Sequence, residues 1–278
     1  MFFIIFCLLC AGGFITLGCL TFWPISYWWQ FYQPIILFLV GFLIGVFFSW
    51  WIAALMGLFV NQKKEFKKPD AWSRFWFKEG LTFIDTFANI NKRRIGFDKI
   101  PRQQKYLLVC NHRSKFDSML ISQYLWKDDI AFIMKESNMK IPLGHKFMHG
   151  LCYLPITRED KIKDLKQMKK AENLLVDNIC SIGVFPEGTR HSDILLGDFH
   201  EGVFNIAIHS KCPLVIMTSK NTETIHKCFP FKRSKIVQEV LCVLYEDDYS
   251  NMTAKALSDL VHQMMENNLK KYYKEYEK

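Results

Sequence analysis

The sequence predicts an α/β fold, in which helices flank a mostly parallel sheet and a two-helix membrane hairpin precedes that sheet. Two observations lead to this prediction. Short apolar runs alternate with amphipathic helical patterns in the later part of the chain, an order typical of parallel sheets. Residues 1–62 contain no Asp, Glu, Lys, Arg or His, so the formal net charge of +9 belongs entirely to residues 63–278. We therefore expect a membrane hairpin at 1–62, an amphipathic interfacial connector at 63–98 and an α/β domain at 99–278.

Two apolar runs predict the hairpin. Phe2–Phe22 would form a helix of roughly 32 Å, close to the ~30 Å hydrocarbon core, and Pro34–Val60 one of roughly 40 Å that spans with tilt. Residues 23–33 between them are uncharged and rich in Trp and Tyr, which favour the headgroup level. The second run is followed at once by Lys63, Lys64, Lys67 and Lys68. The positive-inside rule then places the following domain on the cytoplasmic side.

Three other interpretations of this segment compete with a spanning hairpin. A cleaved signal peptide needs a basic start, and nothing basic precedes Lys63. A lipoprotein site at Cys19 lacks the expected preceding residues. A hairpin that dips into one leaflet without crossing stays open, because length alone permits both arrangements. Spanning and re-entrant hairpins both make an integral membrane protein.

The connector is aromatic and basic. Trp72–Phe87 carries many aromatic residues among charged ones, and Lys92–Arg94 follows. Such a helix next to a membrane segment suits the interface. Its apolar face is equally suited to packing on the following domain, and one helix can do both.

The elements of the α/β domain follow in order. Short apolar runs predict strands at Tyr106–Cys110, Ala131–Met134, Ser181–Phe185, Pro213–Met217 and Lys235–Tyr245. Helical spacing predicts helices at about Asp117–Leu125, Asp160–Val176, Gly202–His209 and Thr253–Tyr273. The nine cysteines lie mostly in apolar runs, without paired C-x-x-C sets, so a reducing cytosolic setting fits better than disulfides or structural zinc.

Two strand exits carry candidate chemistry. In such sheets ligands bind beyond the carboxyl ends of the strands. His112 and Asp117 are separated so that a strand-to-helix turn can fold the carboxylate back onto one ring nitrogen, leaving the other free to take a proton. On spacing alone, a surface histidine beside a helix-capping aspartate remains the favoured interpretation. The segment Phe185–Arg190 is more specific, because a glycine, a hydroxyl and a guanidinium at a strand exit can hold a phosphate.

The order of these motifs resembles the glycerolipid acyltransferase family, especially bacterial 1-acyl-sn-glycerol-3-phosphate acyltransferases (lysophosphatidate acyltransferases). The resemblance rests on Asn111-His112-x4-Asp117 followed by Phe185-Pro186-Glu187-Gly188-Thr189-Arg190. It extends over about Lys99 to Met217 through further segments, namely Met134–Ser137, Pro142–Gly144, Gly150–Arg158 and Cys212–Ile216. One departure is Phe199-His200-Glu201-Gly202, where members often carry a lysine in place of His200.

The resemblance implies an O-acyltransferase that moves a fatty acyl group from a thioester to the 2-hydroxyl of 1-acyl-glycerol-3-phosphate, making phosphatidic acid for phospholipid synthesis. It assigns His112 as general base and Asp117 as the group that orients it. Acceptor binding falls to Arg158, Glu187, Gly188, Thr189 and Arg190, with Lys135 as a further candidate. It implies no metal and no cofactor, and direct transfer in which neither Cys110 nor Ser114 acts as a nucleophile.

The expected partners follow from the same assignment. They are lysophosphatidic acid, a donor that is either acyl-CoA or acyl carrier protein, and an anionic membrane surface, which the basic charge attracts. Nucleic acid is disfavoured because the charge lies on a membrane-tethered domain. Acylation of glycerol-3-phosphate or another lysophospholipid stays open. An idle membrane scaffold is disfavoured by the intact motifs, and a hydrolase by the lack of a G-x-S-x-G elbow. The expected location is the cell membrane, with the catalytic domain on the cytoplasmic face.

Overall fold

The computed structural model describes residues 1–22, 32–191, 196–228 and 232–276. The helices are α1 (Phe2–Phe22), α2 (Tyr32–Leu58), α3 (Ala71–Phe87), α4 (Phe116–Tyr124), α5 (Gly144–Gly150), α6 (Lys161–Val176), α7 (Phe204–Ser210), α8 (Ile225–Cys228), α9 (Glu246–Tyr249) and α10 (Ala254–Tyr276). The strands are β1 (Ile90–Ile95), β2 (Leu107–Cys110), β3 (Ile130–Lys135), β4 (Leu154–Ile156), β5 (Ser181–Val184), β6 (Leu214–Lys220) and β7 (Ser234–Leu244). Short 3-10 turns are η2 (Phe97–Lys99), η3 (Glu136–Lys140), η4 (Glu201–Val203) and η5 (Thr222–Thr224).

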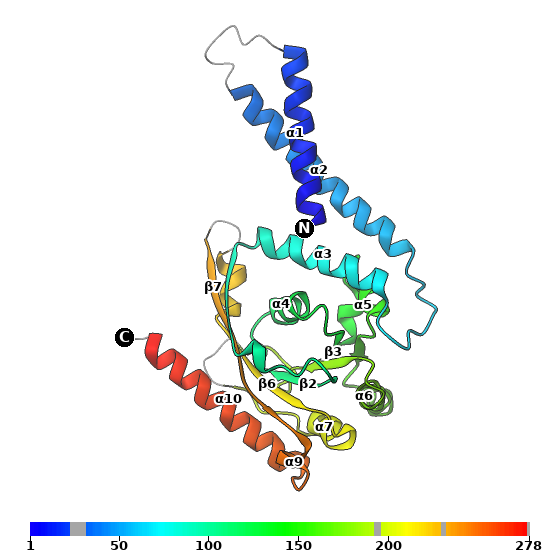
Figure 1. Cartoon of the computed structure of the whole chain (residues 1–278), viewed down its shortest axis with the longest axis vertical. Helices are drawn as coiled ribbons and strands as arrows, with labels where there is room; N and C mark the ends of the chain where they lie inside the picture. Colours follow the sequence, from blue (N-terminus) through cyan, green and yellow to red (C-terminus); the bar gives the residue numbers. More distant parts are fainter. Residues whose placement is uncertain (23–31, 192–195, 229–231, 277–278) are drawn as a thin grey trace.

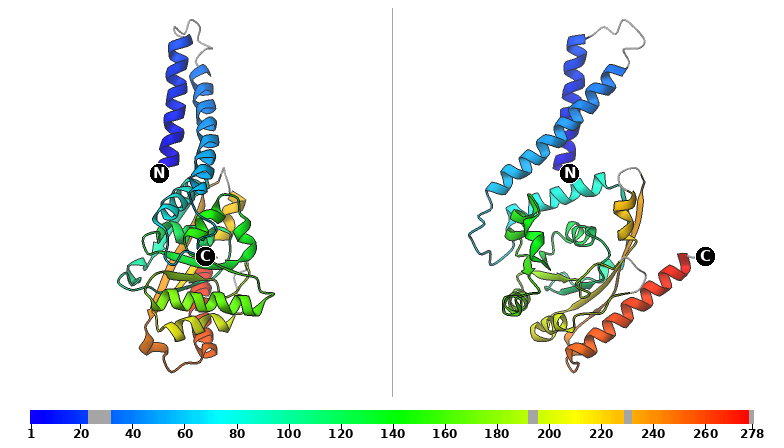
Figure 2. Two further views of the ribbon diagram at one scale, coloured as in Figure 1. Left: turned by 90° about the vertical axis from the view of Figure 1, so that its right-hand side faces the viewer. Right: turned by 180° about the vertical axis from the view of Figure 1, so that it is seen from behind.

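A helical hairpin stands above an α/β domain, and α3 lies between the two (Figure 1). The hairpin projects away from the sheet in both further views (Figure 2). The predicted architecture, a mostly parallel sheet with helices and two preceding apolar helices, is confirmed.

The hairpin helices meet through small residues. Both α1 and α2 are long and apolar enough to cross a membrane. A Cβ added at Gly45 would lie 2.7 Å from the Cys7 Cα, and one at Gly41 would lie 2.9 Å from the Ala11 Cα. Glycine at these positions lets the two backbones approach closely. Residues 23–31 of the predicted headgroup-level segment lie outside the described part of the chain.

Helix α3 joins the hairpin to the sheet domain. It begins at Asp70, whose side chain accepts a hydrogen bond from the Ser73 backbone N–H at 2.8 Å. On one side Phe77 packs edge-on against Tyr153 of the sheet domain, at a ring-centroid distance of 5.8 Å. Phe75 remains exposed. Packing of the connector on the following domain is therefore confirmed, and its contact with a membrane stays a prediction.

The described strands form one seven-stranded sheet in the order β1-β7-β6-β2-β5-β3-β4. The five strands from β6 to β4 run parallel to one another. Strand β7 is antiparallel to β6, and β1 runs parallel to β7. The carboxyl ends of the five parallel strands therefore meet at one edge, where the two candidate motifs occur.

The central strands are buried because helices cover both faces of the sheet. Figure 1 shows α3 and α4 on one side and α7 and α10 on the other. All four residues of β2 are buried, as are all seven of β6. Strands that are buried along their whole length belong to a sheet that is covered on both faces. The predicted strands and helices are all present, with ends shifted by a few residues.

Five of the described helices and strands were not predicted: β1, β4, α5 and the four-residue helices α8 and α9. Strand β1 lies inside the expected connector and reads Ile-Asn-Lys-Arg-Arg-Ile, a polar pattern that belongs to a half-exposed edge strand. Strand β4 has only three residues, one of them a proline. Helix α5 has seven residues and begins and ends at glycine.

Candidate active site

The turn after β2 brings His112 and Asp117 together. Asp117 lies in the first turn of α4 and is fully buried. Its Oδ2 accepts hydrogen bonds from the backbone N–H groups of Arg113 and Ser114, each at 2.7 Å, and lies 3.1 Å from His112 Nδ1. Because a carboxylate only accepts, the proton sits on Nδ1, and Nε2 is the nitrogen that can take a proton. The geometry expected for a general base is present.

An aromatic stack holds the face of the imidazole. The His112 ring lies parallel to the Phe185 ring, with centroids 4.2 Å apart and an interplanar angle of 19°. Phe185 stacks in turn on Phe132 of β3 at 5.4 Å. The ring of His112 is thus fixed by Asp117 at one edge and by Phe185 on one face, while part of it remains open to solvent.

Glu187 fastens the second motif to the first. Its Oε1 accepts from the His112 backbone N–H at 2.7 Å, and its Oε2 accepts from the Gly197 backbone N–H at 2.9 Å. The His191 backbone N–H donates to the His112 carbonyl at 2.9 Å. Burial raises the pKa of Glu187, and the two backbone donors oppose that rise. Glu187 therefore joins the two motifs into one unit, and its expected contact with an acceptor stays untested.

Arg158 precedes α6 and lies beside the loop that contains Gly188, where a residue in the first turn of α6 holds its backbone. Its guanidinium donates to the Gly188 carbonyl. Asp164 accepts from the backbone N–H groups of Thr157 and Arg158, each at 2.7 Å. Desolvation acts to raise the pKa of Asp164, but these donors outweigh it and the pKa is lowered. Gly188 has φ of +66°, and a Cβ there would lie 2.8 Å from His200 Nε2, so any other residue at this position would be strained.

The remaining predicted residues lie at the same edge of the sheet and face solvent. Arg158, Thr189 and Arg190 are exposed, and Thr189 Oγ1 lies 3.0 Å from His191 Nε2. Lys135 is exposed at the end of β3, where it pairs in register with Ile156, two residues before Arg158. The structure therefore gathers every predicted site residue at one edge, with the base partly enclosed and the cationic groups outside.

Several neighbours of the site were missed by sequence reasoning. The imidazole of His200 lies against Gly188, although the sequence marked His200 only as a departure from the family pattern. His191 follows the Phe185–Arg190 segment directly and could have been included by proximity. The partners of Arg113 and Asn111 lie far along the chain and left no local signal.

Cys110 has no access to this chemistry. Its side chain is fully buried, with Sγ 3.4 Å from Ser219 Oγ. Burial raises the pKa of the Cys110 thiol well above its ordinary value. The sulfur is therefore protonated at neutral pH. Within the described ranges, no cluster of three or more His, Cys, Asp or Glu side chains could hold a metal ion.

Comparison with known proteins shows what the part of the chain that carries this site is similar to. A family model described as Acyltransferase matches residues 93–220. The 1-acyl-sn-glycerol-3-phosphate acyltransferase of Haemophilus influenzae is 24% identical over 180 residues, covering 62% of this chain and 72% of that protein. The protein of that name from Chlamydomonas reinhardtii is 27% identical over 178 residues, and the match spans 63% of this chain and about half (52%) of the relative.

A solved structure shares the fold. The crystal structure of the 1-acyl-sn-glycerophosphate (LPA) acyltransferase PlsC from Thermotoga maritima aligns with a TM-score of 0.57 and 20% identity. The alignment covers 80% of this chain and 95% of that one, so the likeness includes more than the sheet domain alone. Both candidate motifs, at residues 111–117 and 185–190, lie within the family match. Over residues 93–220, the chain is therefore similar to the acyltransferase family.

Proposed function

We propose that this chain transfers a fatty acyl group from an acyl thioester to the 2-hydroxyl of 1-acyl-glycerol-3-phosphate, making phosphatidic acid. The observation that carries the proposal is the 2.7 Å hydrogen bond from the His112 backbone N–H to Glu187. It joins the turn that bears a histidine base to the loop that bears exposed cationic and hydroxyl groups. The family match and the names of the relatives support the same reaction.

The proposed chemistry is direct transfer between two substrates. His112 Nε2 removes the proton of the acceptor hydroxyl as its oxygen attacks the thioester carbonyl carbon. Asp117, bonded to Nδ1, keeps the ring in the required tautomer and stabilises the imidazolium that forms. The carbon–sulfur bond then breaks, and the leaving thiolate takes the proton from Nε2. The new ester bond and the free thiol balance the step.

The acceptor phosphate is assigned to the exposed groups around Gly188. Arg158 and Arg190 present guanidinium groups, which match phosphate oxygens in pairs. Lys135 adds a point charge from the end of the neighbouring strand. Thr189 offers a hydroxyl at the loop tip. Glu187 is assigned a positioning role, because backbone donors occupy both of its oxygens.

The membrane arrangement forms part of the proposal. Both hairpin helices have the length and composition to enter a bilayer, and four lysines follow α2 within ten residues. This pattern supports an integral protein whose catalytic domain lies on the cytoplasmic face, where lysophosphatidic acid and an anionic lipid surface are both present. Acyl-CoA and acyl carrier protein are both suitable thioester donors.

The decisive experiment is an acceptor panel with the purified full-length chain. The panel contains 1-acyl-glycerol-3-phosphate, glycerol-3-phosphate and a choline lysophospholipid, each with acyl-CoA and with acyl carrier protein as donor. We expect phosphatidic acid from the first acceptor at a higher kcat/KM than either other product. Preference for glycerol-3-phosphate or the choline lipid would replace the acceptor assignment. Failure to restore growth of a strain lacking phosphatidate synthesis, at an expression level matched to an inactive His112→Ala control, would count against the function itself.

A further inference from the structure

Two side chains that flank His112 in the sequence reach across to the same segment. On one side, Asn111 Nδ2 donates to the Ser219 carbonyl at 3.0 Å, and Asn111 Oδ1 accepts from the Ser219 backbone N–H at 2.7 Å. On the other side, Arg113 Nε donates to Glu223 Oε2 at 2.7 Å. Ser219 and Glu223 belong to the end of β6 and the turn η5. The turn that carries His112 is therefore held at both of its neighbours.

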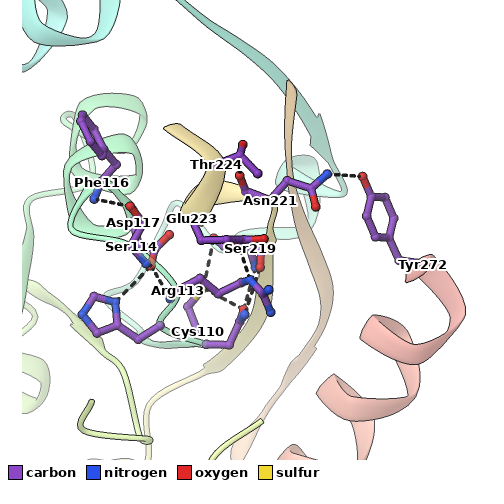
Figure 3. Close-up of polar contacts among 12 residues, drawn as sticks. Cys110, Arg113, Ser114, Phe116, Asp117, Ser219, Asn221, Glu223, Thr224 and Tyr272 are labelled. Atoms are coloured by element: carbon purple, nitrogen blue, oxygen red, sulfur yellow. Dashed lines mark hydrogen bonds and ion pairs between the residues drawn. The ribbon is translucent and has the colours of Figure 1, made fainter. Parts of the chain in front are cut away.

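The Arg113–Glu223 ion pair lies inside the protein. The side chain of Arg113 is 4% exposed and that of Glu223 is 14% exposed. The guanidinium also lies over the ring of Tyr273 in α10, 5.4 Å from its centroid. In Figure 3, Arg113 extends away from Asp117 toward Glu223. The Arg113 guanidinium therefore points into the protein, whereas the candidate acceptor-binding residues face solvent.

The segment that receives Arg113 is itself fixed. Asn221 has a positive φ of +62°, and Thr224 Oγ1 donates to its carbonyl at 2.7 Å. Asn221 Nδ2 donates to the Tyr272 hydroxyl at 3.1 Å, a contact drawn in Figure 3. Helix α10 thereby holds η5, and η5 holds Arg113.

The position of Arg113 matters because Asp117 depends on the backbone of that turn. Asp117 Oδ2 accepts from the Arg113 backbone N–H and from Ser114. Asp117 Oδ1 is buried and has no hydrogen-bond partner among the described residues. The orientation of the carboxylate, and with it the His112 Nδ1 contact, is therefore set by the path of residues 113 and 114.

We propose that Arg113 and Glu223 are a positioning pair, which fixes the turn bearing His112 and Asp117 without touching either substrate. This inference rests on the proposed acyl transfer and names residues that the reaction did not yet assign. If the pair acts in this way, its loss changes the rate of the chemical step and leaves acceptor binding unchanged, because small displacements of a reacting group are costly.

The test compares Arg113→Gln, Glu223→Gln and the double variant in the full-length protein. We expect each single variant to lower kcat by about tenfold or more, with the acceptor KM within about twofold of wild type. Each single variant removes one member of a buried ion pair and should also lower Tm. The double variant should recover most of that Tm while kcat stays low. Recovery of kcat together with Tm would show a purely structural role and overturn the proposal.

Three comparisons sharpen the result. Arg113→Lys keeps the charge without the planar fork, so we expect its kcat to lie between those of wild type and Arg113→Gln. A matched control is Arg74→Gln with Asp129→Asn, a partly buried ion pair at the opposite edge of the sheet, which should leave kcat unchanged. A rise in acceptor KM at constant kcat in Arg113→Gln would instead make Arg113 a binding residue.

A readout independent of turnover separates this proposal from the proposed function. The Nδ1 proton of His112 that bonds Asp117 should give a downfield resonance in the wild-type NMR spectrum. Arg113→Gln should broaden or shift that resonance, and the Arg74→Gln control should not. An unchanged resonance overturns the positioning role even if the enzyme is active. A changed resonance in a chain that acylates no acceptor supports the positioning role and removes the proposed function.

Discussion

At the residue scale, the candidate site consists of an enclosed part, which holds the proposed base, and an exposed part, which carries the cationic groups. His112, Asp117 and Glu187 are tied to backbone N–H groups and to one another, so their geometry is set before any substrate arrives. Arg158 and Arg190 stand outside this unit. A preorganised base with an exposed cationic rim suits a reaction in which a charged lipid must reach a partly buried histidine.

The base assignment predicts a large rate loss. We expect His112→Ala to lower kcat by at least ~10²-fold, the usual effect of removing a general base. Asp117→Asn should also be strongly impaired, because an amide can hold the ring in the wrong tautomer. Initial rates with saturating substrates measure both, and His112→Gln serves as a polar control of similar bulk. Near-normal turnover of His112→Ala would end the mechanism.

The two arginines should act on the acceptor. We expect Arg158→Ala and Arg190→Ala to raise KM for 1-acyl-glycerol-3-phosphate by about tenfold, while KM for the thioester donor changes little, because guanidinium groups recognise the acceptor phosphate. Arg102→Ala, an exposed arginine paired with Asp128, is the matched control. If donor KM rises instead, these residues bind the donor.

The fully buried thiol predicts the absence of a covalent intermediate. Because burial raises the pKa of Cys110 far above neutral pH, Cys110→Ala should keep substantial activity. Mass spectrometry of the intact protein after incubation with donor alone should find no added acyl group. A stoichiometric adduct that disappears in Cys110→Ala would contradict direct transfer.

At the element scale, long periodic segments were predictable and short or polar ones were not. The alternation of apolar runs and helical patterns gave α6, α10 and the central strands, because those elements are buried on regular faces. The same pattern missed β4 and α5, because three and seven residues are too few for apolar side chains to recur at strand or helix spacing. The Arg113–Glu223 pair was equally invisible, since its members are 110 positions apart and meet only through the pairing of β2 with β6.

Helix α3 predicts a measurable contact with lipid. Phe75 is 46% exposed on the helix that lies directly below the hairpin (Figure 1). Phe75→Ser should raise the apparent KM for acceptor presented in vesicles by about fivefold, in keeping with the loss of about 1 kcal/mol of apolar burial. The KM for a short-chain acceptor in solution should not change. Val176→Ser, which alters an exposed apolar side chain of α6, is the control, and an equal rise in both variants would contradict the proposed contact of Phe75 with lipid.

At the scale of the whole molecule, the expected boundary at residue 98 separates strands that belong together. Strand β1, at residues 90–95, pairs along its length with β7, so part of the connector is part of the sheet. A chain truncated to residues 99–278 exposes the backbone donors and acceptors of β7 as a free edge, whereas residues 63–278 keep that edge covered. We expect the shorter form to aggregate in size-exclusion chromatography and the longer form, in the same detergent, to elute as a defined species. Equal behaviour would show that β1 is dispensable.

The pairing of β1 with β7 also has a consequence for the order of events during synthesis. The hairpin and β1 leave the ribosome early, but β7 is made after all six of the other described strands. Such a distant pairing closes late, because the intervening chain must be ordered first. With the hairpin in the bilayer, as proposed above, the nascent protein would be held at the membrane while its sheet is still open at β1. Chaperone protection would be needed in that interval, and the mature enzyme would not need it.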